Sequence, residues 1–183
     1  MATDFQGFPK IARFSREIII TEKLDGTNAQ IYIEPDPLLD SFVLRVGSRS
    51  RWLTLDDDNF GFAAWTFEHR DELIRGLGPG RHFGEWWGKG IQRGYGLKER
   101  RFSLFNASRW TEETMPVCCH VVPMIYRGPP TDLAIMSALS VLEAGGSRAA
   151  PGFMRPEGVI IYHTAANVLF KKTLEDDNAK SAP

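Results

Sequence analysis

The sequence predicts an α+β fold built mainly from antiparallel sheets. Segments with strand character outnumber helical ones and cluster in hairpin-like pairs, and no regular alternation of strand and helix is present. Of the 183 residues, 43% are hydrophobic and 25% are charged, which is typical of one folded domain rather than of a disordered chain. We therefore expect a single domain over residues 1–183, with a polar tail from about residue 175.

The first two strands are expected within Glu17–Glu34, on either side of the turn signal Asp25-Gly26. An apolar run at residues 18–20 precedes this turn, and apolar side chains at positions 29, 31 and 33 alternate with other residues after it. Further strand candidates are residues 42–46, 81–85, 102–105, 118–126, 159–162 and 168–172.

Two helices are predicted between these strands. The first covers residue 58 to about residue 76, and the second begins at Thr131 and ends at Gly145-Gly146. One face of the first helix would carry the apolar residues Phe60, Ala64, Phe67 and Ile74. The buried stripe of the second helix would consist of Leu133, Met136 and Leu142.

Charge and cysteine content exclude several classes of protein. The chain has 22 Lys and Arg against 23 Asp and Glu, so only a local basic face, not bulk charge, can attract nucleic acid. Its two cysteines, Cys118 and Cys119, are adjacent, which excludes a disulfide scaffold and favours a reducing compartment. No apolar run approaches the roughly 18 residues of a membrane span. With no signal-peptide pattern at the start, we expect a cytoplasmic protein that does not bind membranes.

The segment most informative about chemistry is Thr21-Glu22-Lys23-Leu24-Asp25-Gly26-Thr27-Asn28. Its lysine stands between a predicted strand and a turn, where the amine can project into a cleft. On this segment alone, an exposed hairpin lysine is an equally good interpretation, because short motifs also occur by chance. The order of further motifs along the chain favours a functional lysine.

These motifs resemble those of the covalent nucleotidyltransferases, whose signature is K-x-D-G, and most closely those of the RNA ligase 2 family of polynucleotide ligases. The resemblance runs from about Glu17 to Leu174. Besides the segment above, it rests on Gly47-Ser48-Arg49-Ser50-Arg51, Phe83-Gly84-Glu85-Trp86, Phe102-Ser103-Leu104-Phe105-Asn106, Pro156-Glu157-Gly158-Val159-Ile160 and Leu169-Phe170-Lys171-Lys172-Thr173. It implies an adenylation domain in which helices flank antiparallel sheets and a nucleotide cleft lies between the sheets.

The resemblance also implies roles for individual residues. Lys23 would become bonded to AMP taken from ATP, Glu157 would hold Mg²⁺ or Mn²⁺, and Lys171 would contact the α-phosphate. The residues implied in nucleotide binding are Glu22, Asn28, Arg49, Glu85, Phe105 and Lys172. Among them, Glu85 would accept a hydrogen bond from a ribose hydroxyl, and Phe105 would stack on adenine.

The two lysines of the last motif are adjacent here, whereas the family usually separates them by one residue. Adjacent residues of a strand point to opposite faces, so only one of the pair can face the nucleotide. We expect Lys171 to do so and keep Lys172 as the alternative register.

A basic segment follows Glu85 in the sequence. Its cations are Lys89, Arg93, Lys98, Arg100 and Arg101, with Trp86, Trp87 and Tyr95 among them. Interleaved cations and aromatic rings are typical of surfaces that bind single strands. We expect this segment to bind the polynucleotide, either RNA or a nicked duplex with a 5′-phosphate and a 3′-hydroxyl; a solvated loop is the alternative.

The sequence therefore predicts an ATP-dependent RNA ligase that forms a lysyl-AMP intermediate, transfers AMP to a 5′-phosphate and seals the strand with a 3′-hydroxyl. The alternatives are a GTP-dependent guanylyltransferase of the capping type and a catalytically silent module that binds nucleotide or RNA. Many relatives carry a further C-terminal domain that engages the polynucleotide. We expect no OB-fold or other accessory domain within residues 1–183. Recruitment of the strands by a protein partner is one alternative to such a domain.

Overall fold

The structure is a computed structural model that describes residues 4–175, and it confirms the α+β class. Its strands are β1 (Ile18–Lys23), β2 (Thr27–Pro35), β3 (Phe42–Ser48), β4 (Trp52–Leu53), β5 (Gly80–Gly88), β6 (Arg100–Leu104), β7 (His120–Val121), β8 (Met124–Gly128), β9 (Gly158–His163) and β10 (Val168–Thr173). Its helices are α1 (Phe62–Glu68), α2 (Arg70–Leu77) and α3 (Asp132–Gly145). Most of the expected tail, residues 176–183, lies outside the described residues.

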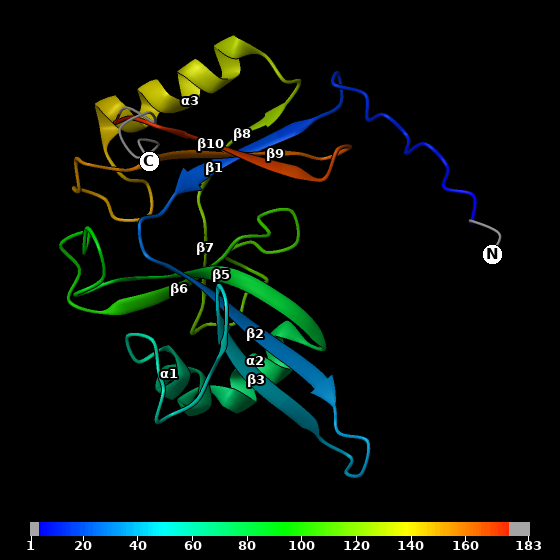
Figure 1. The fold of residues 1–183 in the computed structure, drawn as a ribbon. Coiled ribbons are helices and arrows are strands. Elements are labelled where there is room, and N and C mark those ends of the chain that lie inside the picture. The colour runs from blue at the N-terminus through cyan, green and yellow to red at the C-terminus, as the bar shows by residue number, and fades with distance from the viewer. Residues whose placement is uncertain (1–3, 176–183) are drawn as a thin grey trace, which may run out of the picture.

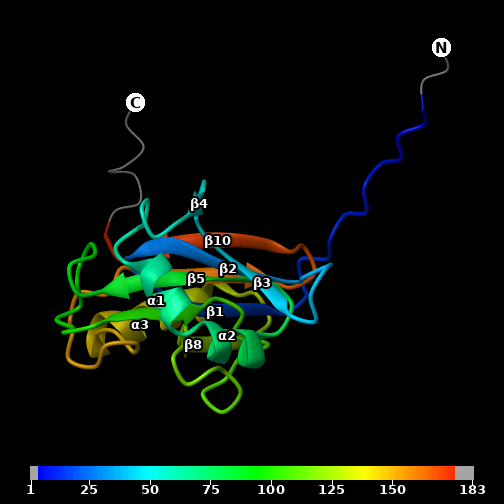
Figure 2. The same ribbon diagram turned by 90° about the horizontal axis from the view of Figure 1, so that it is seen from below.

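The strands form two sheets. The smaller sheet has the order β10-β9-β1-β8, and the larger has the order β4-β3-β2-β5-β6-β7. Neighbouring strands are antiparallel, except that β6 and β7 run parallel. Figure 1 shows α3 covering the outer face of the smaller sheet, while α1 and α2 lie against the larger sheet. The segment before β1 extends away from this body (Figures 1 and 2).

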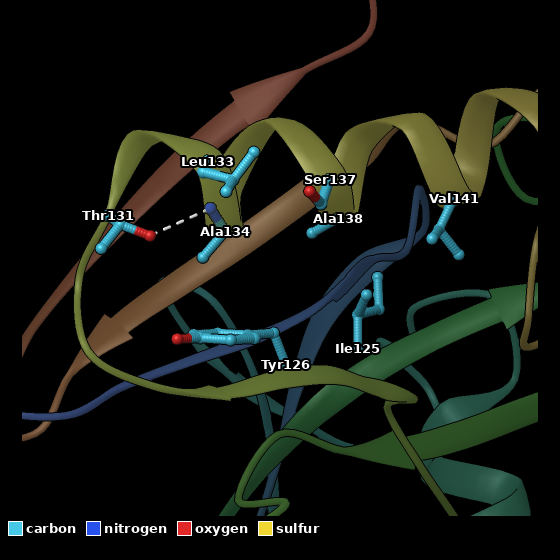
Figure 3. Close-up of a pocket in the computed structure, with 8 residues that line it drawn as sticks. All are labelled: Ile125, Tyr126, Thr131, Leu133, Ala134, Ser137, Ala138 and Val141. Carbon is cyan, nitrogen blue, oxygen red and sulfur yellow. Dashed lines mark hydrogen bonds between the residues drawn. The ribbon is translucent and has the colours of Figure 1, made fainter.

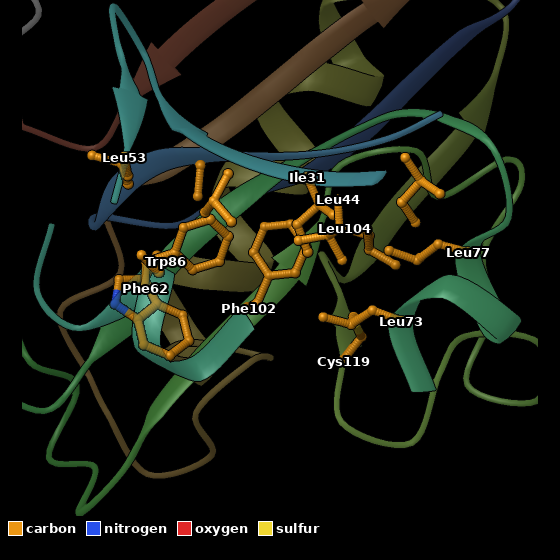
Figure 4. Packing of buried hydrophobic residues seen from close by; sticks show 14 of the residues in the cluster. Ile31, Leu44, Leu53, Phe62, Leu73, Leu77, Trp86, Phe102, Leu104 and Cys119 are labelled. Carbon is orange, nitrogen blue, oxygen red and sulfur yellow. The ribbon is translucent and has the colours of Figure 1, made fainter. Parts of the chain in front are cut away.

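The larger core lies between α1, α2 and one face of the larger sheet (Figure 4). It includes Ile31, Leu44, Phe62, Leu73, Trp86, Phe102 and Leu104, and Ile31 and Phe102 are fully buried. The predicted alternation of β2 is confirmed, because Ala29, Ile31 and Ile33 point into this core. The residues between them therefore lie on the opposite face of the larger sheet.

The smaller core lies between α3 and the outer face of the smaller sheet. It consists of Ile18, Ile20, Ala134, Ala138, Leu139, Leu142, Val159 and Ile161. The predicted start of this helix at Thr131 is confirmed: Thr131 is the N-cap of α3, and its hydroxyl accepts a hydrogen bond from the Ala134 N–H over 3.1 Å. The predicted buried stripe of this helix is correct only at Leu142, because Leu133 and Met136 are mostly exposed.

Two predicted elements are divided in the structure. The helix expected over residues 58–76 is broken at His69 into α1 and α2, so residues expected on one face do not share it: Phe60 and Phe67 are exposed, whereas Phe62 and Leu73 are buried. The strand expected over residues 118–126 forms as β7 and β8, in different sheets, with Pro123 between them. Proline lacks the N–H that a continuous ladder needs.

The strands on either side of Asp25-Gly26 form, but they do not pair with each other. β1 pairs with β8 and β9, while β2 pairs with β3 and β5. The chain therefore crosses from the smaller to the larger sheet through residues 24–26. Among residues 4–175, none of the helices combines the length and the apolar character that a membrane span requires.

Candidate active site

Lys23 and Glu157 meet at one end of the smaller sheet. Lys23 is the last residue of β1, and Glu157 directly precedes β9, where Gly158 is paired with Lys23. The Nζ atom of Lys23 donates a hydrogen bond to Oε2 of Glu157 over 2.5 Å, although 134 positions separate the two in the sequence. Their side chains are 23% and 10% exposed. The amine is therefore held by a carboxylate and not left in open solvent.

Gly26 brings this end of β1 against the larger sheet. A Cβ atom at this position would lie 2.5 Å from the Trp86 carbonyl oxygen and 2.7 Å from Cβ of Trp87. Since such contacts are too short for a real side chain, only glycine allows the turn to approach β5 this closely.

Glu85 of β5 receives two hydrogen bonds from the segment that follows the turn. The Gly26 N–H donates to Oε1 over 3.1 Å, and Nδ2 of Asn28 donates to Oε2 over 2.9 Å. Asn28 and Glu85 are paired across β2 and β5, so their side chains share a face. We call Lys23, Glu157, Glu85 and Asn28 the candidate active site.

The electrostatics of this site centre on Glu85. Its side chain is buried, and this desolvation raises its pKa from 4.5 to about 7. The hydrogen bonds from Asn28 and Gly26 and the charge of Lys23 oppose the rise in pKa, whereas the charge of Glu157 adds to it. Glu85 is thus poised to change charge near neutral pH.

Arg93 joins three segments around the candidate active site. Its Nε donates to Oδ2 of Asp25 over 2.9 Å, and Nη1 donates to the Arg155 carbonyl oxygen over 3.2 Å. Nη1 and Nη2 also donate to the two carboxylate oxygens of Glu175, each over 3.2 Å. These partners lie two residues after Lys23, two residues before Glu157 and just after β10. The predicted role of Arg93 in binding a polynucleotide would require it to leave these partners.

Tyr95 supports the same turn and was not predicted to belong to the site. Its hydroxyl accepts a hydrogen bond from the Asp25 N–H over 2.8 Å, and its ring packs edge-on against Trp87. Burial raises the pKa of this hydroxyl. In the sequence, Tyr95 is a tyrosine in the glycine-rich segment after β5. Since an exposed aromatic residue fits this pattern equally well, the sequence does not identify Tyr95 as part of the site.

The register of β10 separates the two adjacent lysines. Lys171 is paired with Ile160, which in turn is opposite Thr21 of β1. Directly paired residues share a face of the sheet, and so do Thr21 and Lys23, which are two positions apart in β1. Lys171 therefore lies on the face of Lys23. Lys172 is paired with Val159, a member of the core beneath α3, and therefore lies on the opposite face.

Glu22 also lies on the face opposite to Lys23. Its Oε2 accepts hydrogen bonds from the backbone N–H groups of Arg148 (2.8 Å) and Ala149 (3.0 Å). Its buried Oε1 has no hydrogen-bond partner within residues 4–175. Burial raises the pKa of this carboxyl, and the side chain of Ser147 counters the rise. The side chain of Glu22 thus anchors the loop after α3, apart from the candidate active site.

Phe105 and Arg49 occupy the larger sheet. The backbone N–H of Phe105 donates to the Phe83 carbonyl over 3.0 Å, which extends the β5–β6 ladder beyond the pair formed by Glu85 and Ser103. Phe105 therefore shares the face of Glu85, and its ring is 42% exposed. Arg49 is exposed in the turn between β3 and β4.

The basic segment after Glu85 is less open than predicted. Arg100 donates to the backbone carbonyl oxygens of Lys89 and Phe60, and Arg101 pairs with Glu99. Lys89 and Lys98 are exposed. The aromatic residues expected to alternate with these cations, namely Trp86, Trp87 and Tyr95, are buried, so they do not offer rings to a strand in this conformation.

An apolar pocket of about 330 Å³ lies elsewhere, between α3 and β8 (Figure 3). It is lined by Ile125, Tyr126, Thr131, Leu133, Ala134, Ser137, Ala138 and Val141. Because α3 covers the face of the smaller sheet opposite to Lys23, this pocket is separate from the candidate active site.

Comparison with solved structures shows what this fold is similar to. A Naegleria gruberi RNA ligase with PPi has a TM-score of 0.60 and 20% identity, and the match covers 87% of this chain and 50% of that chain. A lysine-to-alanine variant of that ligase with ATP and Mn has a TM-score of 0.60 and 19% identity, covering 87% and 49%. A glutamate-to-alanine variant with AMP and Mn gives 0.60 and 19%, covering 87% and 50%. This chain thus spans about half the length of those chains, and at such identities the likeness concerns the fold.

Comparison of the sequence with known families and proteins gives one clear result. No curated protein matches the chain. The model of the RNA ligase family matches residues 16–174, which includes every strand and helix described above. The chain therefore belongs to the RNA ligase family.

Proposed function

We propose that the chain is the adenylation domain of an ATP-dependent RNA ligase. The observation that carries this proposal is the 2.5 Å contact between Lys23 Nζ and Glu157 Oε2, with Glu85 and Asn28 beside it. Family membership alone supports ligase chemistry. The convergence of an amine and two carboxylates from distant segments supports a nucleophilic lysine within that chemistry.

In the proposed first step, the free amine of Lys23 attacks the α-phosphorus of ATP. A bond from Nζ to phosphorus forms, the bond from phosphorus to the bridging oxygen breaks, and pyrophosphate leaves with the electron pair. The amine must lose a proton before or during attack, and Oε2 of Glu157 already accepts an Nζ proton in a hydrogen bond. Lys171, on the same sheet face, is the cation available to offset charge on the α-phosphate.

The later steps pass AMP to the polynucleotide. An oxygen of its 5′-phosphate displaces Lys23 from the α-phosphorus, which restores the amine and forms a 5′–5′ pyrophosphate linkage. A 3′-hydroxyl then attacks the 5′-phosphate phosphorus, its proton is released, and AMP leaves. Glu85 and Asn28 would orient the ribose, and the exposed ring of Phe105 would stack on adenine.

The side chains present fit a divalent cation that is shared with the nucleotide. Within residues 4–175, no three His, Cys, Asp or Glu side chains form a metal-binding group. Magnesium, however, is often held by one or two carboxylates together with phosphate oxygens, and Glu157 supplies such a carboxylate. When bound, Mg²⁺ or Mn²⁺ would neutralise charge that develops on the phosphates.

Labelling of the protein with α-³²P-ATP tests the nucleophile. We expect the intact protein to become covalently labelled and Lys23→Ala to remain unlabelled. Lys10→Ala, which removes an exposed lysine before β1, is the matched control and should be labelled like the wild type. Labelling that persists in Lys23→Ala would contradict the assignment.

The same experiment separates the alternative functions. Labelling by GTP in place of ATP would indicate a capping-type guanylyltransferase, and binding of ATP without covalent labelling would indicate a silent module. Joining of matched nicked RNA, DNA and hybrid duplexes, with ATP and Mg²⁺ or Mn²⁺, then tests the ligase activity and its preferred strand.

A further inference from the structure

A row of aromatic and polar side chains continues the face of the candidate active site along β2. Asn28, Gln30 and Tyr32 alternate with buried residues and therefore lie on one face of the larger sheet. Across the β2–β5 ladder, Gln30 is paired with Phe83 and Tyr32 with Arg81. Tyr32 is four residues from Asn28, or roughly 13 Å along an extended strand.

The guanidinium group of Arg81 lies over the rings of Tyr32 and Trp52 at the far end of this row. The guanidinium carbon of Arg81 lies 4.3 Å from the centre of the Tyr32 ring and 5.4 Å from that of the Trp52 ring. The two rings are 6.3 Å apart. Nη1 of Arg81 also donates to Oε1 of Gln30 over 3.0 Å, which fixes the guanidinium plane. We call these three residues the stacking platform.

The stacking platform is open to solvent although it is built on a sheet. Trp52 is 45% exposed, and Phe83, between the platform and Glu85, is 51% exposed. Single exposed aromatic residues are ordinary on protein surfaces. Here several planar groups share one face, and a regular ladder holds them in register with the candidate active site.

Charge favours a polyanion at this face. Arg81 forms no ion pair with a carboxylate among the described residues, and Arg49 is exposed in the neighbouring β3–β4 turn. Glu34 is engaged by Arg45 over 3.0 Å. A surface that offers neighbouring aromatic rings, a guanidinium plane and unpaired positive charge suits a single-stranded nucleic acid, because each of its nucleotides carries a π-face and a phosphate.

We propose that Arg81, Tyr32 and Trp52 bind an unpaired base of the RNA strand that the candidate active site acts on. This inference rests on the proposed function, since it takes RNA as the substrate class. Because the platform is separated from Asn28 along β2, a strand that reaches both places contributes several linked nucleotides. The aromatic rings in the segment after Glu85, which were expected to contact the strand, are buried. We therefore assign the aromatic part of the strand-binding surface to the stacking platform instead.

Fluorescence anisotropy with a short, 5′-labelled single-stranded RNA tests the proposal. Loss of the stacking of one base typically weakens binding about 5- to 150-fold, so we expect Trp52→Ala and Arg81→Ala each to weaken binding about fivefold or more. Phe67→Ala is the matched control, because it removes an exposed ring from α1 on the opposite side of the larger sheet. It should bind RNA like the wild type. Trp52→Phe and Arg81→Lys accompany these variants, with thermal unfolding to verify that all of them fold.

A second RNA, in which several bases are removed and the phosphates are kept, separates stacking from charge. The wild type should bind this abasic RNA more weakly than the intact RNA, and Trp52→Ala should show a much smaller difference between the two. Arg81→Lys keeps the charge and loses the planar fork, so it should resemble Arg81→Ala if stacking dominates. Equal affinity of the folded Trp52→Ala, Arg81→Ala and wild-type proteins for intact RNA would overturn the proposal.

Labelling with α-³²P-ATP keeps this result distinct from a failure of the proposed function. The platform variants should be labelled at the wild-type rate, since their side chains do not contact Lys23, Glu157 or Glu85. If the wild type is not labelled while the platform variants still lose RNA affinity, the adenylation proposal fails and the binding site remains. If labelling occurs and RNA affinity does not depend on the platform, the binding site fails alone.

Discussion

Arg93 and Asp25 form an ion pair, with Nε of the arginine 2.9 Å from Oδ2 of the aspartate. Asp25 belongs to the turn that follows Lys23, and the same guanidinium group binds the segment before Glu157 and Glu175, just after β10. A single side chain thus fixes the relative positions of the segments that carry the candidate nucleophile and its acidic partner.

Replacement of Arg93 should therefore affect adenylation without removing a group that contacts ATP. We expect Arg93→Ala to lower the free energy of unfolding by about 1–3 kcal/mol, because a partly buried, charged hydrogen bond is lost. It should also slow covalent labelling by about tenfold, because Lys23 and Glu157 would be less well placed. A tenfold slowing corresponds to an increase of about 1.4 kcal/mol in the activation free energy. Urea unfolding and the time course of labelling measure the two effects.

Arg101→Ala is the control for Arg93, because it removes an arginine whose partner, Glu99, is exposed. It should alter stability by less than about 1 kcal/mol and leave labelling unchanged. Compared with Arg93→Ala, Arg93→Lys should restore more of the free energy of unfolding than of the labelling rate. Lysine keeps the positive charge but lacks the forked guanidinium group that reaches several acceptors. If Arg93→Ala lowers the free energy of unfolding but is labelled at the wild-type rate, Arg93 stabilises the fold without positioning Lys23 and Glu157 for labelling.

The pKa of Glu85 predicts how stability depends on pH. Its value in the folded protein, about 7, exceeds 4.5, so between these pH values the folded state binds more protons than the unfolded state. The free energy of unfolding should therefore fall as pH rises from 4.5 to about 7, by an amount on the order of 3 kcal/mol.

Glu85→Gln should reduce this decline, which urea unfolding at about pH 5 and about pH 8 would detect. The decline should shrink rather than vanish, because burial also raises the pKa of Glu22, which remains in the variant. An unchanged difference in stability between the two pH values would contradict the pKa assigned to Glu85.

The register of β10 predicts different effects of its two lysines. Lys171 shares the face of Lys23, so Lys171→Ala should slow covalent labelling by about a hundredfold, as expected when a charge that stabilises a transition state is lost. Lys172→Ala should change the rate much less, because its side chain lies on the face of α3. The reverse ranking would mean that β10 shifts by one residue when ATP binds.

Gly26 predicts a steric effect on both stability and labelling. Gly26→Ala would place a methyl group 2.5 Å from the Trp86 carbonyl oxygen, so the turn must move away from β5. We expect a loss of about 1–3 kcal/mol in the free energy of unfolding, together with slower labelling. Gly145→Ala, where an added Cβ meets nothing within 4 Å, is the control and should not lower stability. Equal stability of the two variants would argue against close packing at the turn.

The sequence predicted the antiparallel strands well, because they depend on local patterns, and it predicted the family from several short motifs that follow one another in order. Alternation in β2 and the start of α3 near Thr131 are properties of a few consecutive residues, and the motif at Lys23 is read in the same way. The bend at His69 could not be read from local patterns, since helical periodicity continues on both sides of it. The exposure of Leu133 likewise depends on how α3 lies on its sheet.

The partners of charged residues were the least predictable feature of the site. Arg93 lies in a basic segment, which favours an interpretation as a phosphate ligand, and its carboxylate partners are 68 and 82 residues away. The same holds for Trp86 and Trp87, whose burial depends on α1 and on the crossing segment. Contacts between distant segments leave no spacing signal in a single sequence.

The passage of the chain from β1 to β2 has a mechanical consequence. Lys23 and Glu157 are carried by the same sheet, whereas Glu85 and Asn28 are carried by the other, and residues 24–26 link the two sheets directly after Lys23. A rocking motion of one layer over the other would leave the amine and its carboxylate partner together. It would instead change the distance between that pair and Glu85 with Asn28. Under the proposed function, the spacing of the two sheets would then set which nucleotide pose is reactive.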